Sequence, residues 1–167
     1  MRVLGIDCGT EYTGYGVVEQ ADDGRLSCRA VGAIRLNSRE PLPARLHSIY
    51  CRLNELIRQH QPDDVAIEDV FYAVNVKSAL KLGQVRGVAM LAAAAAGLPV
   101  AEYAPLAIKS AVVGYGRAEK SQVQQMVSRL LCLKSLPQPS DAADALAIAI
   151  CHLHTAATLV RQAATQT

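Results

Sequence analysis

Residues 3–19 read VLGIDCGTEYTGYGVVE, and this stretch decides the fold. Residues 3–7 form a short apolar run that ends in an acid just before Gly9, which is typical of a buried strand. Two further strands are predicted over residues 13–19 and 26–36, because both segments are rich in Val, Ile, Tyr and Gly. The turn Ala21-Asp22-Asp23-Gly24 lies between them. We therefore expect the chain to open with an antiparallel meander of three strands.

Helices and strands alternate after this meander. A fourth strand is expected to run parallel to the first, because a long helix connects it to the meander. The order predicts an α/β fold: a mixed five-stranded sheet, with three antiparallel opening strands and then parallel strands, flanked by helices. The expected elements are helices over residues 41–60 and 76–96, strands over 65–70 and 99–103, and final helices over 106–113, 119–133 and 142–160.

The composition fits one globular unit. Of the 167 residues, 51% are hydrophobic and 19% are charged, which supports a sizeable core and excludes a disordered protein. We expect one domain over residues 1–160 and a short frayed tail over 161–167. We expect no membrane span, because no apolar run is long enough, and no signal peptide, because the first apolar run meets an acid at Asp7. The five cysteines show no CxxC spacing, which indicates reduced thiols and a cytoplasmic protein.

Charge is distributed unevenly along the chain. Residues 1–70 hold eight arginines and eleven acids, a net charge of −3, whereas residues 71–167 have a net charge of +5. Two interpretations of this difference are open. The basic residues are either scattered over solvated helix faces, or they form a basic surface that binds a polyanion around acids from other parts of the chain.

Two acids are expected at the ends of buried strands. Asp7 closes the first strand, either as a turn residue before Gly9 or as a functional carboxylate. Glu68 lies in the fourth strand, where alternation places it on the face of Ala66 and Asp69 on the opposite face. A carboxylate inside a central strand is costly unless it is paired or bound to metal. We therefore choose Glu68 as the partner of Asp7 and expect Asp69 to reach solvent.

Two more acids, Asp141 and Asp144, begin the last helix. Their spacing of three residues places them on one helical face. Acids in a first helical turn also favour the helix dipole and cap free N–H groups, which is a sufficient structural role for an isolated pair. Together with the two strand acids, however, they offer the hard oxygen ligands that a pair of Mg²⁺ ions requires.

The chain resembles the RuvC-type Holliday-junction resolvases, bacterial endonucleases of the ribonuclease H-like superfamily. The resemblance runs from about residue 3 to residue 154, and it depends on short motifs in a fixed order rather than on any one of them. These are GIDCG (5–9) with TGYG (13–16), AIEDVF (66–71), SALKLGQ (78–84) with RG (86–87), VVG (112–114) with EKSQV (119–123), and DAADALA (141–147).

The resemblance implies that Asp7, Glu68, Asp141 and Asp144 are catalytic and hold two Mg²⁺ ions per subunit, for which Mn²⁺ can substitute. It implies a homodimer that nicks two opposed strands of a four-way DNA junction symmetrically in recombination and repair, leaving 5′-phosphate ends. It also implies association with the RuvA–RuvB branch-migration complex.

The resemblance further assigns residues that hold DNA. Phe71, beside Tyr72, is either a core anchor or the loop aromatic that stacks on an unpaired base at the junction centre. Replacing Phe71 with Ala is expected to lower cleavage and to preserve folding. Lys77, Lys81 and Gln84 form a polar stripe at helical spacing, which is either a solvated face or a phosphate contact.

Two lysines match the active-site cations of the family. Lys109 and Lys120 would offset charge at the scissile phosphate, although a solubilising surface role is the commoner one for any lysine. Arg117, in the flexible segment before Lys120, is expected to contact the DNA backbone.

Some residues depart from the family pattern or invite another interpretation. Cys8 replaces the proline that commonly follows the first aspartate, and Glu11 and Asp69 add negative charge near the site without being counted as ligands. Cys151, His152 and His154 suggest zinc, but only Cys151 and His154 share a helical face, and the chain has no second pair of ligands.

Other functions remain to be compared. Asp7-x-Gly9 and Gly14-x-Gly16 also resemble the first nucleotide loop of the actin–Hsp70–sugar-kinase class, but 167 residues cannot supply its two domains. Another ribonuclease H-like nuclease acting on RNA or RNA–DNA hybrids, or a junction-binding protein without catalysis, are the remaining alternatives. Metal-dependent cleavage of a junction discriminates among them.

Overall fold

Five strands form one sheet in the order β3-β2-β1-β4-β5. The computed structural model describes residues 1–69 and 75–165, with side chains described up to residue 158. Strands β1 to β3 pair antiparallel, whereas β4 pairs parallel with β1 and β5 pairs parallel with β4. The predicted mixed five-stranded sheet is confirmed. Its strands are β1 (Arg2–Asp7), β2 (Tyr12–Gln20), β3 (Leu26–Arg35), β4 (Asp64–Glu68) and β5 (Val100–Tyr103).

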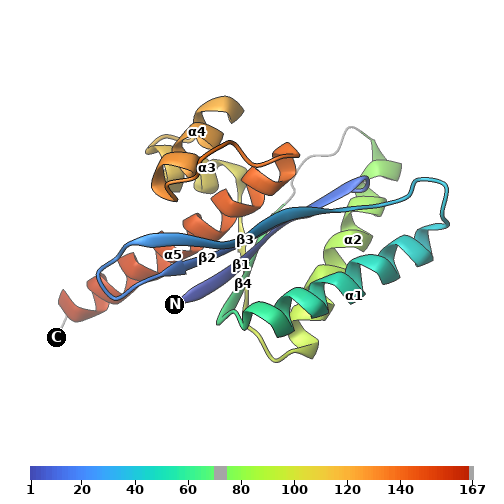
Figure 1. The fold of residues 1–167 in the computed structure, drawn as a ribbon, viewed down its shortest axis with the longest axis horizontal. Coiled ribbons are helices and arrows are strands. Elements are labelled where there is room, and N and C mark those ends of the chain that lie inside the picture. Colours follow the sequence, from blue (N-terminus) through green and yellow to red (C-terminus); the bar gives the residue numbers. More distant parts are fainter. Residues whose placement is uncertain (70–74, 166–167) are drawn as a thin grey trace.

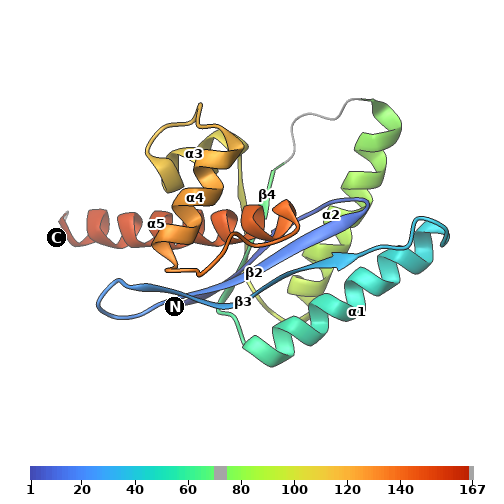
Figure 2. The same ribbon diagram turned by 45° about the horizontal axis from the view of Figure 1, so that its top comes forward.

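Helices cover both faces of this sheet (Figures 1 and 2). They are α1 (Leu42–His60), α2 (Val76–Ala95), α3 (Pro105–Val113), α4 (Lys120–Leu130) and α5 (Ser140–Thr165). Helices α1 and α2 cover one face, and α5 covers the other with α3 and α4 beside it. Side chains alternate along β1, so that Val3 packs in the core on the α5 side while Leu4 and Ile6 pack on the α1 side. No helix in the described parts of the chain is both long and apolar enough to cross a membrane.

Helix α5 lies close against the backbone of β1 and β2. A Cβ atom on Gly5 would come within 2.1 Å of the carbonyl oxygen of Ala145. A Cβ atom on Gly14 would come within 2.0 Å of the carbonyl oxygen of Asp141. Only glycine permits this approach, so these two residues set the height of the first turns of α5 above the sheet. The same contact brings the start of α5 to the carboxyl end of β1, because Gly14 pairs with Asp7.

Three boundaries differ from those predicted. Strand β4 ends at Glu68, so Asp69 lies beyond it, and residue 70 lies outside the described residues. Helix α4 ends at Leu130 instead of residue 133, because Cys132 adopts a left-handed φ of 51°. Helix α5 begins at Ser140 and extends to Thr165, so residues 161–165 are helical where a frayed tail was expected.

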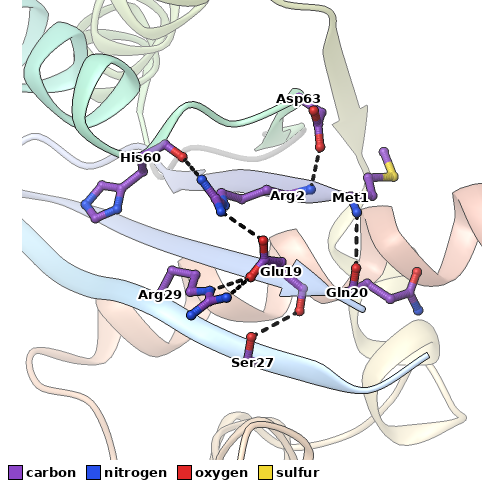
Figure 3. Close-up of polar contacts among 8 residues, drawn as sticks. All are labelled: Met1, Arg2, Glu19, Gln20, Ser27, Arg29, His60 and Asp63. Atoms are coloured by element: carbon purple, nitrogen blue, oxygen red, sulfur yellow. Dashed lines mark hydrogen bonds and ion pairs between the residues drawn. The ribbon is translucent and has the colours of Figure 1, made fainter. Parts of the chain in front are cut away.

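The amino end of β1 is held by a network of paired charges (Figure 3). The Arg2 backbone N–H donates to Asp63 Oδ2 at 2.6 Å, and Arg2 Nη2 lies 2.8 Å from Glu19 Oε1. Arg2 also donates to the carbonyl oxygen of His60, and Arg29 donates to the other carboxylate oxygen of Glu19. This network joins β1 to β2, β3, the end of α1 and the start of β4.

Candidate active site

Asp7 and Glu68 end two adjacent parallel strands. The register pairs Ile6 with Ile67, so the next positions along the two strands are Asp7 and Glu68. Paired residues of parallel strands point to the same face, and Val3 and Ala66, which share that face, lie in the core on the α5 side. Both carboxylates therefore face α5. Asp69 lies on the other side, where its Oδ1 is 3.1 Å from Arg86 Nη2 of α2, instead of reaching solvent alone.

Asp141 and Asp144 are brought to these strand ends by the first turn of α5. Asp141 is half-buried, and its carboxylate accepts a long hydrogen bond of 3.5 Å from the Ser140 hydroxyl. Asp144 follows one turn later and is also half-buried. The close packing of α5 on Gly14 fixes the backbone of Asp141 against β2, beside the end of β1. This packing brings the start of α5, with its two acids, beside the end of β1.

The four acids interact electrostatically. The pKa of Asp7 is raised to about 7, chiefly by burial and then by the negative charges of Asp144, Glu68 and Asp141, while Lys120 opposes the shift. Burial and the charge of Asp144 also raise the pKa of Glu68. The pKa of Asp144 is raised by its burial, although a hydrogen bond from Lys120 opposes that shift. The site therefore holds more negative charge than its own lysines compensate.

Lys120 supplies positive charge at the first turn of α4. Its Nζ atom lies 2.6 Å from Asp144 Oδ2. A capping box fixes the start of this helix, since the backbone N–H of Glu119 donates to Gln122 Oε1 at 2.8 Å. Burial alone would lower the pKa of Lys120, but the hydrogen bond and charge of Asp144, with Asp7 and Asp141, outweigh burial and raise it. Lys120 therefore remains an ammonium at neutral pH.

A cavity of about 250 Å³ opens beside these groups. It brings together Glu68, Asp144 and the two predicted lysines, Lys109 and Lys120. Lys109 is half-buried on α3, and its charge lowers the pKa of Glu68 against the effect of burial. Apolar side chains form the rest of the wall, so that charges in this cavity interact through a medium less polar than water. The remaining lining residues are Pro105, Ile108, Val123, Ala147 and Ile148.

The oxygen atoms of these carboxylates are the ligand type that a divalent metal prefers, but the side chains are too far apart to share one ion. Within residues 1–69 and 75–165, no three Asp, Glu, His or Cys side chains stand close enough to hold an ion together. Hard oxygen donors from β1, β4 and α5 nevertheless interact with one another, and burial and then the neighbouring carboxylates of Asp144, Glu68 and Asp141 raise the pKa of Asp7. The donor set thus fits Mg²⁺, provided that the carboxylates draw closer and Lys120 releases Asp144.

Of the predicted DNA-contacting residues in the described parts of the chain, Lys120 lines the cavity and the others do not. Lys77 and Gln84 are exposed on α2, where Lys81 is half-buried, and Arg117 is exposed between α3 and α4. Among the described residues, none that lines the cavity comes from α2. Phe71 and Tyr72 lie outside the described residues.

The cysteine and histidine cluster of α5 has other partners than zinc. His152 Nε2 lies 2.9 Å from Asp64 Oδ2, and its Nδ1 lies 2.8 Å from the Tyr103 hydroxyl. His154 Nδ1 lies 3.0 Å from the carbonyl oxygen of Ala111, and Cys151 is buried. These contacts fasten α5 to β4, β5 and α3.

Sequence reasoning did not select Arg86, which lies directly behind the site. Arg86 forms ion pairs with both Asp69, which directly follows strand β4, and Glu102, which lies in strand β5. It is the only charged residue in the second half of α2, and an isolated charge in an apolar helix face indicates a partner on the sheet. That signal was present in the sequence.

Comparison with known proteins gives a consistent result. The family model described as Crossover junction endodeoxyribonuclease RuvC matches residues 3–152. A protein of that description from Koribacter versatilis is 67% identical over 161 residues, covering 96% of this chain and 97% of the relative. The Thermus thermophilus RuvC structure superposes with a TM-score of 0.88 at 36% identity, covering 95% of this chain and 96% of that one. The structure of T. thermophilus RuvC in complex with Holliday junction substrate gives 0.87 at 34% identity, with the same coverage.

Proposed function

This chain belongs to the crossover junction endodeoxyribonuclease RuvC family, and on that premise we propose that it resolves four-way DNA junctions by hydrolysing one phosphodiester bond in each of two strands. The observation that carries this function is the electrostatic interaction of carboxylates from β1, β4 and α5 beside a cavity that is also lined by Lys109 and Lys120. The Thermus relative bound to a Holliday junction substrate supports the choice of substrate.

We assign Asp7, Glu68, Asp141 and Asp144 as the ligands of divalent metal ions, specifically two Mg²⁺ per subunit, with Mn²⁺ able to substitute. Two such ions, when bound, supply Lewis acidity for an attacking water and for the departing oxygen of a phosphodiester. The raised pKa values of Asp7 and Glu68, caused by burial and then by neighbouring carboxylates, support this assignment, because a bound cation would favour the ionised form of both groups.

The two lysines act directly on the substrate in this proposal. Lys109 and Lys120 face the cavity from α3 and α4, opposite Glu68 and Asp144. An ammonium placed there offsets the additional negative charge of a pentacovalent phosphorus. Expulsion of the 3′ oxygen leaves a 5′-phosphate and a 3′-hydroxyl, which a ligase can seal. Lys120 must release Asp144 before it can reach the phosphate.

Residues outside the cavity would bind the arms of the junction. Lys77, Lys81 and Gln84 on α2 and Arg117 before α4 are exposed or half-buried and could contact phosphates outside the cavity. Phe71 and Tyr72 are proposed from the sequence alone as the pair that stacks on an unpaired base.

The symmetry of the substrate supports a homodimer. A four-way junction has two-fold symmetry, and a two-fold dimer presents one active site to each of two opposed strands. We propose this assembly, together with an association with the RuvA–RuvB complex and a cytoplasmic location.

The experiment that tests the proposed function measures cleavage of a synthetic junction with and without Mg²⁺. Each of its strands is labelled in turn, and both cut positions are mapped to the nucleotide. We expect paired nicks at symmetric positions, and their loss in Asp7→Asn, Glu68→Gln and Asp141→Asn with junction binding retained. Binding without a metal-dependent nick would instead support a non-catalytic junction-binding protein.

Two controls separate the remaining alternative. A linear duplex of the same sequence should stay intact, and an RNA–DNA hybrid should be cut far more slowly than the junction. A hybrid cut as fast as the junction would indicate another ribonuclease H-like nuclease. Mixed dimers of wild-type and Asp7→Asn subunits should nick one strand only, whereas two nicks from such a dimer would contradict one site per strand.

A further inference from the structure

A histidine and a cysteine stand side by side on the exposed surface of α1. His47 and Cys51 are both exposed and are separated by four residues, so they lie one above the other on the helix. Cys51 Sγ lies 3.5 Å from His47 Nε2 and 3.9 Å from Nδ1. Helix α1 covers the face of the sheet opposite α5, so this pair is remote from the four carboxylates (Figure 2).

We propose that His47 and Cys51 form a second metal site, for Zn²⁺ or an ion of similar softness. Zinc binds thiolate sulfur at about 2.3 Å and imidazole nitrogen at about 2.0 Å with tetrahedral angles, which requires about 3.6 Å between the two donor atoms. The observed 3.5 Å between Sγ and Nε2 matches that requirement. The two side chains thus stand at a chelating distance before any ion is bound.

The surroundings leave both donors available. In the described part of the chain, neither side chain has another hydrogen-bond partner. The neighbouring Arg52, whose charge would oppose a cation, is paired with Glu55 at 2.8 Å. Binding converts the thiol to a thiolate and releases its proton to solvent, and water molecules complete the coordination of the ion.

The other cysteines do not share this arrangement. Cys8 and Cys151 are buried, and half-buried Cys28 contacts the carbonyl oxygen of Ala30. Cys132 is exposed like Cys51, but its sulfur contacts the carbonyl oxygen of Arg129 at 3.8 Å and not an imidazole. Cys132 is therefore the matched control for an exposed thiol without a second ligand.

The two proposed sites differ in the metal they select. Thiolate and imidazole favour borderline-soft ions, whereas the carboxylate site takes hard ions such as Mg²⁺. A transition metal on α1 would therefore not compete with Mg²⁺ for ligands. Loss of the α1 site would leave junction cleavage unchanged, so the two proposals can fail separately.

The test uses the full chain, reduced and freed of metal, and titrates it with Co²⁺ as a coloured substitute for Zn²⁺. We expect a thiolate-to-cobalt charge-transfer band that saturates at one ion per chain and that excess Zn²⁺ abolishes. The band should disappear in Cys51→Ser and persist in Cys132→Ser. In His47→Gln the affinity should fall at least about tenfold, because the chelate is lost.

A second measurement locates the ion. Bound Zn²⁺ should slow alkylation of Cys51 and leave alkylation of Cys132 unchanged, as mapped by mass spectrometry of peptides. Junction cleavage in Mg²⁺ should be equal in wild type, Cys51→Ser and His47→Gln. A band that survives in Cys51→Ser, or an affinity that His47→Gln leaves unchanged, would overturn the proposed site.

Discussion

The two ends of β1 carry charge in opposite ways. At the amino end, the Arg2 guanidinium binds Glu19 and the carbonyl oxygen of His60, the Arg2 backbone N–H donates to Asp63, and Arg29 completes the pairing of Glu19. At the carboxyl end, only a few residues away, Asp7 faces three further carboxylates and one paired lysine. The charges at the first end are balanced within the chain, whereas the excess negative charge at the second end is balanced only when cations bind.

This difference gives the two ends opposite dependences on pH. Hydrogen bonds from Arg2 and then Arg29 lower the pKa of Glu19, so its contribution to stability is present at neutral pH and is lost in acid. The pKa of Asp7 is raised from 3.8 to about 7, so folding becomes less favourable as the pH rises through that interval. The paired charges at the amino end of β1 therefore stabilise the fold, whereas the unpaired carboxylates at its carboxyl end are available to bind a cation.

The largest expected effect is on catalysis. Asp7→Asn should lower the rate of junction cleavage at least about 1,000-fold, because it removes a proposed metal ligand together with transition-state charge stabilisation. The matched change at the other end is Asp63→Asn, which affects a carboxylate that accepts only the Arg2 backbone N–H. Single-turnover cleavage at saturating enzyme measures the rate of each variant. Comparable losses of rate in Asp7→Asn and Asp63→Asn would contradict the proposed difference between the two ends of β1.

The second effect is on stability, and its sign is unusual for a buried substitution. In metal-free protein at pH 8, Asp7→Asn should raise the free energy of unfolding by up to roughly 4 kcal/mol, since the carboxylate is forced to ionise about three pH units above its usual range. At pH 4 the gain should vanish. Urea denaturation at both pH values measures it.

The control for that prediction lies at the balanced end. Glu19→Gln should destabilise the protein at pH 8, because Arg2 and Arg29 lose their carboxylate. Saturating Mg²⁺ should narrow the gap between wild type and Asp7→Asn by stabilising the wild type alone. A wild type already as stable as Asp7→Asn without metal at pH 8 would show that the site is not charge-strained.

A third, intermediate effect concerns the lysine at the unpaired end. Lys120→Met should lower cleavage about 100-fold, as expected for loss of one positive group at the reacting phosphate. It should also raise the pKa of Asp144 further, because the hydrogen bond that opposes its shift is removed. Cleavage rates and carboxyl titration by NMR measure the two effects. Lys134→Met, in the exposed segment before α5, should change neither.

The smallest effect is expected from the balanced end itself. Arg2→Met should lower the melting temperature by a few degrees, because Glu19 and the end of α1 lose a shared partner. Cleavage at a temperature well below the transition should remain within about twofold of wild type. Calorimetry measures the melting temperature and the junction assay measures cleavage. A loss of cleavage well beyond twofold at that temperature would mean that the two ends of β1 are coupled.

Much of this arrangement could be predicted from the sequence. Alternation in the fourth strand selected Glu68 over Asp69, and the structure places Glu68 on the face of α5. The hairpin at residues 21–24 and the helix between the meander and β4 gave the correct strand directions. These features depend on local spacing, which a sequence records directly.

Other features could not be predicted from local spacing. The early end of α4 follows from the left-handed backbone of Cys132, a residue type that gives no warning of such a conformation. The pairing of Lys120 with Asp144 and the chain from Asp64 through His152 to Tyr103 join residues that only folding brings together. The sequence argued against zinc at the cysteine and histidine cluster of α5, but it did not show which protein groups its imidazoles bind.

The glycines under α5 have a consequence for how such a site can change. Where a helix touches a sheet through bare backbone, no side chain acts as a spacer, and the separation is fixed by atomic radii. Repacking the core elsewhere would leave the distance from Asp7 to the two helix aspartates almost untouched. Attempts to re-engineer the metal preference of this scaffold should therefore begin at Gly5 and Gly14, where one added methyl group would lift both aspartates together.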